Sequence, residues 1–330
     1  MKKFRKIDIS IIILVYNAET TILEALESIK KQKYRVREII VIDNHSTDDS
    51  VRLVKEFKTK NRKLNITIVV RERLYGVSAS YNLGAKLAKG NYLVTFHSDS
   101  SLSSAFELDK LIQPFLNDSS VVASGSYELL PEKIWNEYGF WQKYIFANSV
   151  GRERASLTGK FDCYKKDTFL DVGGSDEKNF GGKKPVGGED ADLHARLKKV
   201  GKIAQSKAKV IHMHYKGDSF SIKDVVKRKW VFARAYGRVL RIRSNDLSPM
   251  AIIVFLIKPV LGLLPFLPFL HVVGAVLLLT YSIVYSWKMF ITRSTLLNPY
   301  ILCVPVLNIF FIYYEIYWMV RTFFIFDEDN

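Results

Sequence analysis

The amino-acid sequence predicts an α/β protein with a doubly wound, mostly parallel sheet, followed by an interfacial helix and C-terminal transmembrane helices. Short apolar segments alternate with amphipathic helical segments through the first hundred residues, which is the pattern of a parallel sheet with crossover helices. Near the C-terminus, the segments 259–287 and 294–314 contain no Asp, Glu, Lys or Arg. Because about 20 apolar residues span the hydrocarbon core, we interpret these segments as membrane helices rather than as a buried hairpin of a soluble protein. We therefore expect a catalytic region at 1–220, a basic juxtamembrane helix at 221–248 and a transmembrane region at 249–330.

The parallel half of the sheet is predicted from four apolar segments. Strands are expected at 7–15, 38–43, 66–70 and 92–96, with helices at 20–32, after Ser46 and at 78–88. Nearly continuous apolar strands are typical of sheets covered on both faces. In such sheets ligands bind beyond the carboxyl ends of the strands. The polar residues at these ends are Tyr16-Asn17, Asp43-Asn44 and His97-Ser98-Asp99.

The second part of the chain has a mixed pattern. We expect an aromatic helix at Trp135–Ser149, a strand beginning at Thr158 and a helix at Asp192–Val200. Glycines at 173–174 and 181–182 predict a mobile loop ahead of the acidic turn Gly187-Gly188-Glu189-Asp190. Clustered carboxylates repel one another, so an acidic turn of this kind indicates a functional site.

The net charge of +16 suits an anionic partner, either nucleic acid or an anionic membrane surface. The dense basic run lies at 222–243, directly before the apolar segments, and its apolar residues recur near helical spacing. This favours a helix lying on an anionic membrane surface, and we expect no nucleic-acid partner. A soluble helix with a solvated basic face is the alternative.

Three membrane crossings are predicted, at 250–270, 272–290 and 298–320. The basic helix, Lys288 and Arg293 then lie inside and the acidic tail 327–329 lies outside, in accord with the positive-inside rule. Prolines at 259, 265 and 268 allow an alternative in which the first segment is re-entrant, leaving two crossings. The two cysteines lack metal-ligand spacing and indicate reduced thiols. We therefore expect a multi-pass protein of the cell membrane with a cytoplasmic catalytic domain.

Five segments, taken in order, resemble the inverting family 2 glycosyltransferases of the GT-A fold. They are 10–19 (Ser-Ile-Ile-Ile-Leu-Val-Tyr-Asn-Ala-Glu), 41–48 (Val-Ile-Asp-Asn-His-Ser-Thr-Asp), 76–84 (with Gly-Val-Ser-Ala and Asn-Leu-Gly), 88–93 (Ala-Lys-Gly-Asn-Tyr-Leu) and 188–193 (Gly-Glu-Asp-Ala-Asp-Leu). The membrane tail lies outside the resemblance to soluble members, although many members that act on polyprenyl-phosphate lipids or growing glycans carry such a tail.

The resemblance implies a nucleotide-sugar donor bound across the first half of the sheet, with Asp43 at the base. The residues expected to bind it are Tyr16, Asn17, Glu19, Asp43, Asn82, His97 and Ser98. Asp190 matches the base that deprotonates the acceptor hydroxyl. Its neighbour Glu189 is a second catalytic candidate, or an acid that simply begins the helix.

The resemblance also implies a divalent metal on the donor diphosphate. Asp99 matches the last carboxylate of the family's Asp-x-Asp element, and His214, or less well His212, matches a late histidine of the metal site. Two residues depart from the pattern. His97 replaces the first carboxylate, which favours Mn²⁺ over Mg²⁺. Tyr81 stands where the family often has Arg.

The expected function is that of a membrane-anchored inverting glycosyltransferase. Its acceptor is expected to be a polyprenyl phosphate, a lipid-linked precursor or a glycan. The alternative, suggested by His97, is a catalytically weak or inactive membrane protein that binds sugar nucleotides. A nucleotidyltransferase is disfavoured because no Gly-rich, Lys-containing loop follows the first strand.

Overall fold

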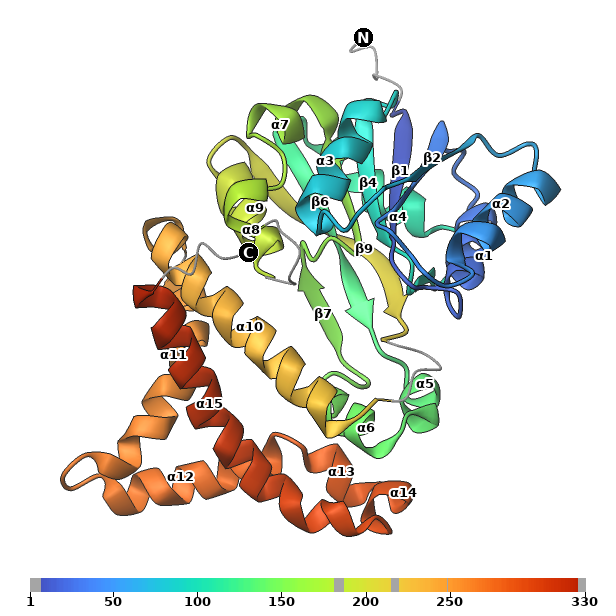
Figure 1. The fold of residues 1–330 in the computed structure, drawn as a ribbon. Helices are drawn as coiled ribbons and strands as arrows, with labels where there is room; N and C mark the ends of the chain where they lie inside the picture. Colours follow the sequence, from blue (N-terminus) through green and yellow to red (C-terminus); the bar gives the residue numbers. More distant parts are fainter. Residues whose placement is uncertain (1–6, 181–186, 215–219, 248, 326–330) are drawn as a thin grey trace.

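The computed structural model describes residues 7–180, 187–214, 220–247 and 249–325. The acidic tail 327–329 and residues 181–186, which include part of the predicted mobile loop, lie outside this described part. Within it, a nine-stranded sheet has the strand order β3-β2-β1-β4-β8-β6-β9-β5, and β7 pairs with β6 (Figure 1).

The parallel half of the sheet is as the sequence predicts. It contains β1 (Ile9–Val15), β2 (Glu38–Asp43), β3 (Ile66–Val70) and β4 (Tyr92–His97), joined through α1 (Ile22–Lys30), α2 (Ser50–Lys60) and α3 (Val77–Leu87). β1 lies between β2 and β4 and is almost fully buried, as its unbroken apolar sequence requires. A Cβ on Gly84 would lie 2.5 Å from Ile12, so this glycine lets α3 pack closely on β1.

The second half of the sheet is mixed. β8 (Phe161–Lys165) runs antiparallel to β4, and β6 (Val121–Leu129) pairs with β7 (Glu153–Ser156), β8 and β9 (Lys202–His212). The short β5 (Ser100–Leu102) pairs with the end of β9. The helices of this half are α4 (Glu107–Asn117), α7 (Lys166–Asp171), α8 (Glu177–Phe180) and α9 (Glu189–Lys198).

The prediction of a single aromatic helix at Trp135–Ser149 is wrong. The chain forms α5 (Glu132–Glu137) and α6 (Phe140–Phe146), separated by extended backbone at Tyr138 and Gly139. Tertiary contacts favour the break, because the Trp135 indole donates to the Lys143 carbonyl and the Tyr138 hydroxyl donates to the Met213 carbonyl. The aromatic residues therefore anchor two short helices beside the end of β9.

The C-terminal third is helical. It comprises α10 (Ile222–Arg243), η1 (Ser244–Asp246), α11 (Pro249–Leu263), η2 (Leu264–Phe266), α12 (His271–Val284), α13 (Trp287–Ile291), α14 (Arg293–Leu296), η3 (Pro299–Cys303) and α15 (Val304–Phe324). α15 lies along α10, and the contact is close enough that a Cβ on Gly237 would lie 2.2 Å from the Met319 carbonyl oxygen (Figure 1). The predicted basic helix at 222–243 is therefore present, but it is sandwiched between the α/β part and α15.

Of the three predicted membrane spans, the third, at 298–320, coincides with a described helical segment of spanning length, and the first two do not. Among the described residues, one helical segment, Pro299–Phe324, is long and apolar enough to cross a membrane. In place of the predicted spans at 250–270 and 272–290 there are α11, with 15 residues, and α12, with 14. Pro265 lies in the 3₁₀ turn η2 that follows α11 and Pro268 lies between that turn and α12, so the prolines mark where the helices break.

Candidate active site

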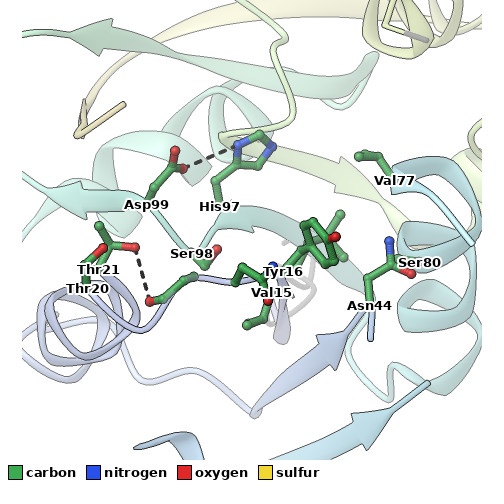
Figure 2. A pocket seen from close by; sticks show the side chains of 13 residues that line it. Val15, Tyr16, Thr20, Thr21, Asn44, Val77, Ser80, His97, Ser98 and Asp99 are labelled. Atoms are coloured by element: carbon green, nitrogen blue, oxygen red, sulfur yellow. Dashed lines mark hydrogen bonds and ion pairs between the residues drawn. The ribbon is translucent and has the colours of Figure 1, made fainter. Parts of the chain in front are cut away.

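A cleft of about 350 Å³ opens at the carboxyl ends of β1 and β4. Figure 2 shows His97 and Asp99 turned toward each other at one end of it, with Asn44 and Ser80 at the other. Of the residues expected to bind the donor, Tyr16, Asn17, His97 and Ser98 line this cleft together with Asp99. The Tyr16 ring is 53% exposed, so its face is free to stack against a planar group.

Two other residues that were predicted to bind the nucleotide-sugar donor instead stabilise the turns next to the cleft. The Asp43 carboxylate is buried and accepts a hydrogen bond from the Ser46 backbone at 3.2 Å. Glu19 accepts from the Asp49 backbone at 3.0 Å. Asn17 does both tasks, because its side chain accepts from the Thr47 backbone at 2.9 Å while the residue lines the cleft. These bonds tie the turn after β1 to the turn after β2.

Asn82 does not line the cleft. Its side-chain amide donates to the Ser175 carbonyl and its oxygen accepts from the Ser175 backbone, both at 2.8 Å. The side chain therefore fastens the glycine-containing loop at 173–175 to α3.

The acidic end of the cleft is built on the pairing of β5 with β9. Ser100 lies opposite His212 in the register, so Asp99, directly before β5, meets the His212 side chain. Asp99 Oδ2 lies 2.9 Å from His212 Nε2, and His212 Nδ1 lies 2.9 Å from Glu128 Oε1. Lys160 pairs with the second oxygen of Glu128 at 2.9 Å. A chain of contacts from Asp99 through His212 and Glu128 to Lys160 thus runs from the cleft into the sheet.

The pKa values reflect this chain. Burial opposes the ionisation of Asp99, but the neighbouring His212 outweighs it and holds the pKa of Asp99 below its usual range. Burial alone would lower the pKa of His212, but the carboxylates of Asp99 and Glu128 raise it. Burial lowers the pKa of His97 to about 4, with partial compensation from Asp99, so this imidazole is neutral at pH 7 and has a lone pair to donate.

Two overlapping groups of side chains can hold a metal ion. In the first, His97, Asp99 and His212 bring their ligand atoms within 4.8 Å of one another. In the second, His214 joins Glu128 and His212, with His214 Nε2 at 3.4 Å from Glu128. The structure therefore places His212 next to Asp99, and His214, the histidine preferred from the sequence, one step further away.

The acidic turn at the start of α9 does not line this cleft, but the charges of Glu189 and Asp190 act on Tyr81, as the charge of Asp99 does. Gly187 and Gly188 have φ values of 67° and 94°, and Gly188 packs against Val239 of α10. Glu189 and Asp190 follow directly. Burial, reinforced by the charge of Asp190, raises the pKa of Glu189 to about 7.

Tyr81 connects the two acidic ends of the site. Burial raises its pKa well above 10, and the carboxylates of Glu189, Asp99 and Asp190 add to the effect because all lie near its hydroxyl. The hydroxyl donates to the Gly159 carbonyl at 2.8 Å. Tyr81 is therefore a neutral side chain within electrostatic range of both Asp99 and Asp190.

Asp192 has a structural role at the start of α9. It is fully buried and its two oxygens pair with Arg196 of α9 and Arg243 of α10. Arg196 also donates to the carbonyls of Val172 and Gly174. The network fixes the start of α9, and with it Asp190, to α10 and to the loop at 172–174.

Sequence reasoning missed Glu128 and gave His212 too little weight. Glu128 is the single acidic residue in the otherwise uncharged segment 121–131, and an isolated carboxylate near a strand end was the available signal.

The comparisons with known proteins agree with this geometry. Residues 10–165 match the family model of glycosyl transferase family 2. These residues form a family 2 glycosyltransferase domain. The match covers β1 to β8, and therefore the Asp99 end of the cleft, whereas the Asp190 turn lies beyond it.

The chain is similar to several curated glycosyltransferases. An uncharacterized glycosyltransferase of Haemophilus influenzae is 30% identical over 119 residues, which is 36% of this chain and 46% of that protein. The UDP-Glc:alpha-D-GlcNAc-diphosphoundecaprenol beta-1,3-glucosyltransferase WfaP of Escherichia coli is 34% identical over 91 residues, 28% of this chain and 35% of that protein. The chain thus spans less than half the length of these curated relatives.

The fold extends beyond the family 2 domain. The mannosyltransferase PcManGT of Pyrobaculum calidifontis, solved with GDP-Man and Mn²⁺, superposes with a TM-score of 0.64 at 14% identity. The superposition covers 97% of this chain and 88% of that protein. The GT-A fold expected from the sequence is therefore confirmed.

Proposed function

We propose that the chain transfers a sugar from a nucleotide-diphospho-sugar to a hydroxyl or phosphate acceptor at the cytoplasmic face of the cell membrane, with inversion at the anomeric carbon. The observation that carries the proposal is that the charges of Asp99, which lines the cleft, and of Asp190, at the start of α9, both act on the buried Tyr81. We infer that a donor diphosphate at Asp99 and an acceptor at Asp190 meet beside Tyr81.

The donor half of the cleft suits a nucleotide. The exposed ring of Tyr16 offers a stacking surface, and Asn17 and Asn44 offer polar groups at the carboxyl ends of β1 and β2. Asp43 and Glu19, predicted as direct ligands, support these turns, and Asn82 acts through the loop at 173–175. We propose that Asp43 does not contact the nucleotide base directly. It stabilises the turn after β2, and that turn positions the base.

The ligand atoms at the acidic end fit a divalent metal. One carboxylate and two imidazoles, from Asp99, His97 and His212, lie within 4.8 Å of one another. Glu128 holds the other nitrogen of His212, as carboxylates commonly do behind metal-bound histidines. Two nitrogen ligands favour Mn²⁺ over Mg²⁺. When bound there, such an ion neutralises the charge of the departing diphosphate.

Asp190 is the proposed general base. Its carboxylate takes the proton of the acceptor hydroxyl as that oxygen bonds to the anomeric carbon, while the bond to the nucleoside diphosphate breaks on the opposite side. Glu189, whose pKa burial raises to about 7, is the second candidate for the same task. Asp192 is excluded as the base because both of its oxygens are paired with arginines.

The apolar helices at 249–325 support a membrane-bound acceptor. The name of WfaP describes transfer to a sugar on diphosphoundecaprenol, which is a lipid-linked acceptor of this kind. We propose an acceptor of the same class, a lipid-linked saccharide or a polyprenyl phosphate. We disfavour an inactive sugar-nucleotide-binding protein because the proposed base Asp190 is present and the ligand atoms of His97, Asp99 and His212 lie together.

The test is nucleotide release by the Asp190→Asn variant. Loss of the base should lower kcat by about 10²–10⁴-fold and leave donor affinity unchanged. Asp171→Asn, which alters an exposed carboxylate of α7 outside the cleft, is the matched control and should retain wild-type turnover. Near-normal turnover of Asp190→Asn would exclude Asp190 as the base.

A further inference from the structure

The surface of α12 differs from that of every helix in the α/β part. Of its 14 residues only Gly274, Leu278 and Ser282 are buried, and they form a single row with a spacing of four. Apolar side chains on the remaining faces are exposed, among them Val272, Val276, Leu279 and Ile283. A partner protein covers one face of a helix, whereas exposure on all but one row is typical of a helix surrounded by lipid.

The turn between α11 and α12 is apolar as well. Phe269 is 97% exposed and Phe266 is 71% exposed, and no charged residue occurs from 259 to 287. If this hairpin crossed a membrane, its tip would lie in water on the far side. A loop of Phe, Leu and Pro would expose its apolar side chains to water at a cost in free energy. The tip is therefore more stable inside the hydrocarbon core of the membrane.

The hairpin is also too short to cross. At 1.5 Å per residue, α11 and α12 are each about 22 Å long, against about 30 Å for the hydrocarbon core. Two helices of this length with an apolar turn suit a hairpin that enters a bilayer and returns to the same side.

α15 is long enough to cross, but it is fastened to the catalytic part along its length. Its Glu315 is buried and pairs with Lys229 of α10 at 2.8 Å and with Lys258 of α11. Near the C-terminal end, Arg241 donates to the carbonyls of Phe323 and Phe324, at 3.3 Å each. The two helices therefore run side by side in the same direction from Lys229 to Arg241.

α10 cannot lie in hydrocarbon. It carries eight Lys or Arg against one Asp, and it is joined to the α/β part through Arg243 and Asp192. Because charged side chains are costly at membrane depth, α10 stays at the polar surface and keeps the C-terminal half of α15 there too. The exposed cations Lys223, Lys227 and Arg241 suit contact with anionic lipid headgroups.

We propose that residues 249–325 embed in one leaflet of an anionic membrane without crossing it, with α11 and α12 as a re-entrant hairpin and the end of α15 on the catalytic side. The proposal rests on the proposed membrane association, and it replaces the three crossings predicted from the sequence. The order from water to lipid is then the α/β part, α10, α15 and the hairpin tip.

Single-cysteine labelling in sealed membrane vesicles of both orientations tests the proposal. Cys163 is buried and Cys303 is exposed, so the background is the full chain with Cys303→Ser. Three single variants are compared: Val200→Cys in the catalytic part, Phe269→Cys at the hairpin tip and Phe324→Cys at the end of α15, all at exposed positions. The probe is a membrane-impermeant maleimide.

Val200→Cys and Phe324→Cys should be labelled in the same vesicle orientation, and Phe269→Cys in neither orientation until detergent is added. Labelling of Phe324→Cys in the opposite orientation would show an odd number of crossings and overturn the proposal. Labelling of Phe269→Cys from the side opposite Val200→Cys would overturn it as well. These readouts do not depend on activity, so they remain decisive if the proposed transfer reaction is wrong.

A depth measurement provides a second test with purified protein. A fluorophore on Phe269→Cys, in vesicles that contain phosphatidylglycerol, should be quenched several-fold more by nitroxides on the acyl chains than by nitroxides on the headgroups. The same fluorophore on Phe324→Cys should show the reverse order. Stronger headgroup quenching at position 269 would place the tip at the surface and contradict the proposal.

Discussion

At the scale of single residues, the position of Asp99 depends on a three-residue strand. β5 pairs with the last residues of β9, and the pairing brings His212 to Asp99. The sequence indicated that a late histidine would lie here but favoured His214. Side chains two apart on a strand share a face, so the spacing alone does not separate His212 from His214. The backbone conformation distinguishes the two histidines. His212 is the last residue of β9, whereas His214 lies beyond the strand with a φ of 42°.

This difference predicts how the metal site responds to substitution. His212→Ala should weaken Mn²⁺ binding by about 10–100-fold, because it removes a side chain that touches Asp99 and Glu128. His214→Ala is the matched control and should change Mn²⁺ affinity by much less. His97→Asp, which restores a carboxylate, should shift the preference toward Mg²⁺. Calorimetric titration of the metal measures all three, and equal losses in the two alanine variants would contradict the assignment.

At the scale of helices and strands, the elements that follow from local hydrophobic periodicity were predicted correctly. The helix break that depends on long-range contacts was not. The four parallel strands and the basic helix at 222–243 follow from hydrophobic periodicity, which is a local property. The break at Tyr138 and Gly139 is not local, because it is stabilised by the contact of Tyr138 with Met213, which is 75 residues away. The number of membrane crossings stays a prediction. The length of an uncharged segment alone does not show where prolines break its helices, as they do between α11 and α12.

The contact of α10, α11 and α15 predicts a large stability effect at Glu315. Glu315→Gln leaves Lys229 and Lys258 without their shared counter-charge in a mostly buried setting, which should cost on the order of 3 kcal/mol. Glu27→Gln is the control, because Glu27 pairs with Lys30 on an exposed face of α1 and should cost about 1 kcal/mol or less. Thermal unfolding in lipid nanodiscs measures both, and similar melting temperatures for the two variants would mean that the pairs with Glu315 contribute little.

At the scale of the whole molecule, the catalytic turn and the membrane helices share one support. α10 contacts the Gly188 turn ahead of Asp190 on one side and α15 on the other. Asp192 pairs with Arg243 of α10 as well as with Arg196. Asp190, the proposed base, is therefore held at a fixed position relative to the apolar helices, as transfer to the proposed lipid-linked acceptor would require. The sequence alone indicated both regions, but it contained no signal for this connection.

The most direct test of the proposed function is nucleotide release by the purified chain in nanodiscs that contain a bacterial lipid extract as acceptor. A panel of UDP-, GDP- and dTDP-sugars is supplied with Mn²⁺, with Mg²⁺ or with a chelator. We predict that one donor is consumed with release of its nucleoside diphosphate, faster with Mn²⁺ than with Mg²⁺, and that the chelator abolishes the release until Mn²⁺ is restored. No nucleotide release from any donor, or release that is indifferent to the chelator, would contradict the account of a metal-assisted glycosyltransferase.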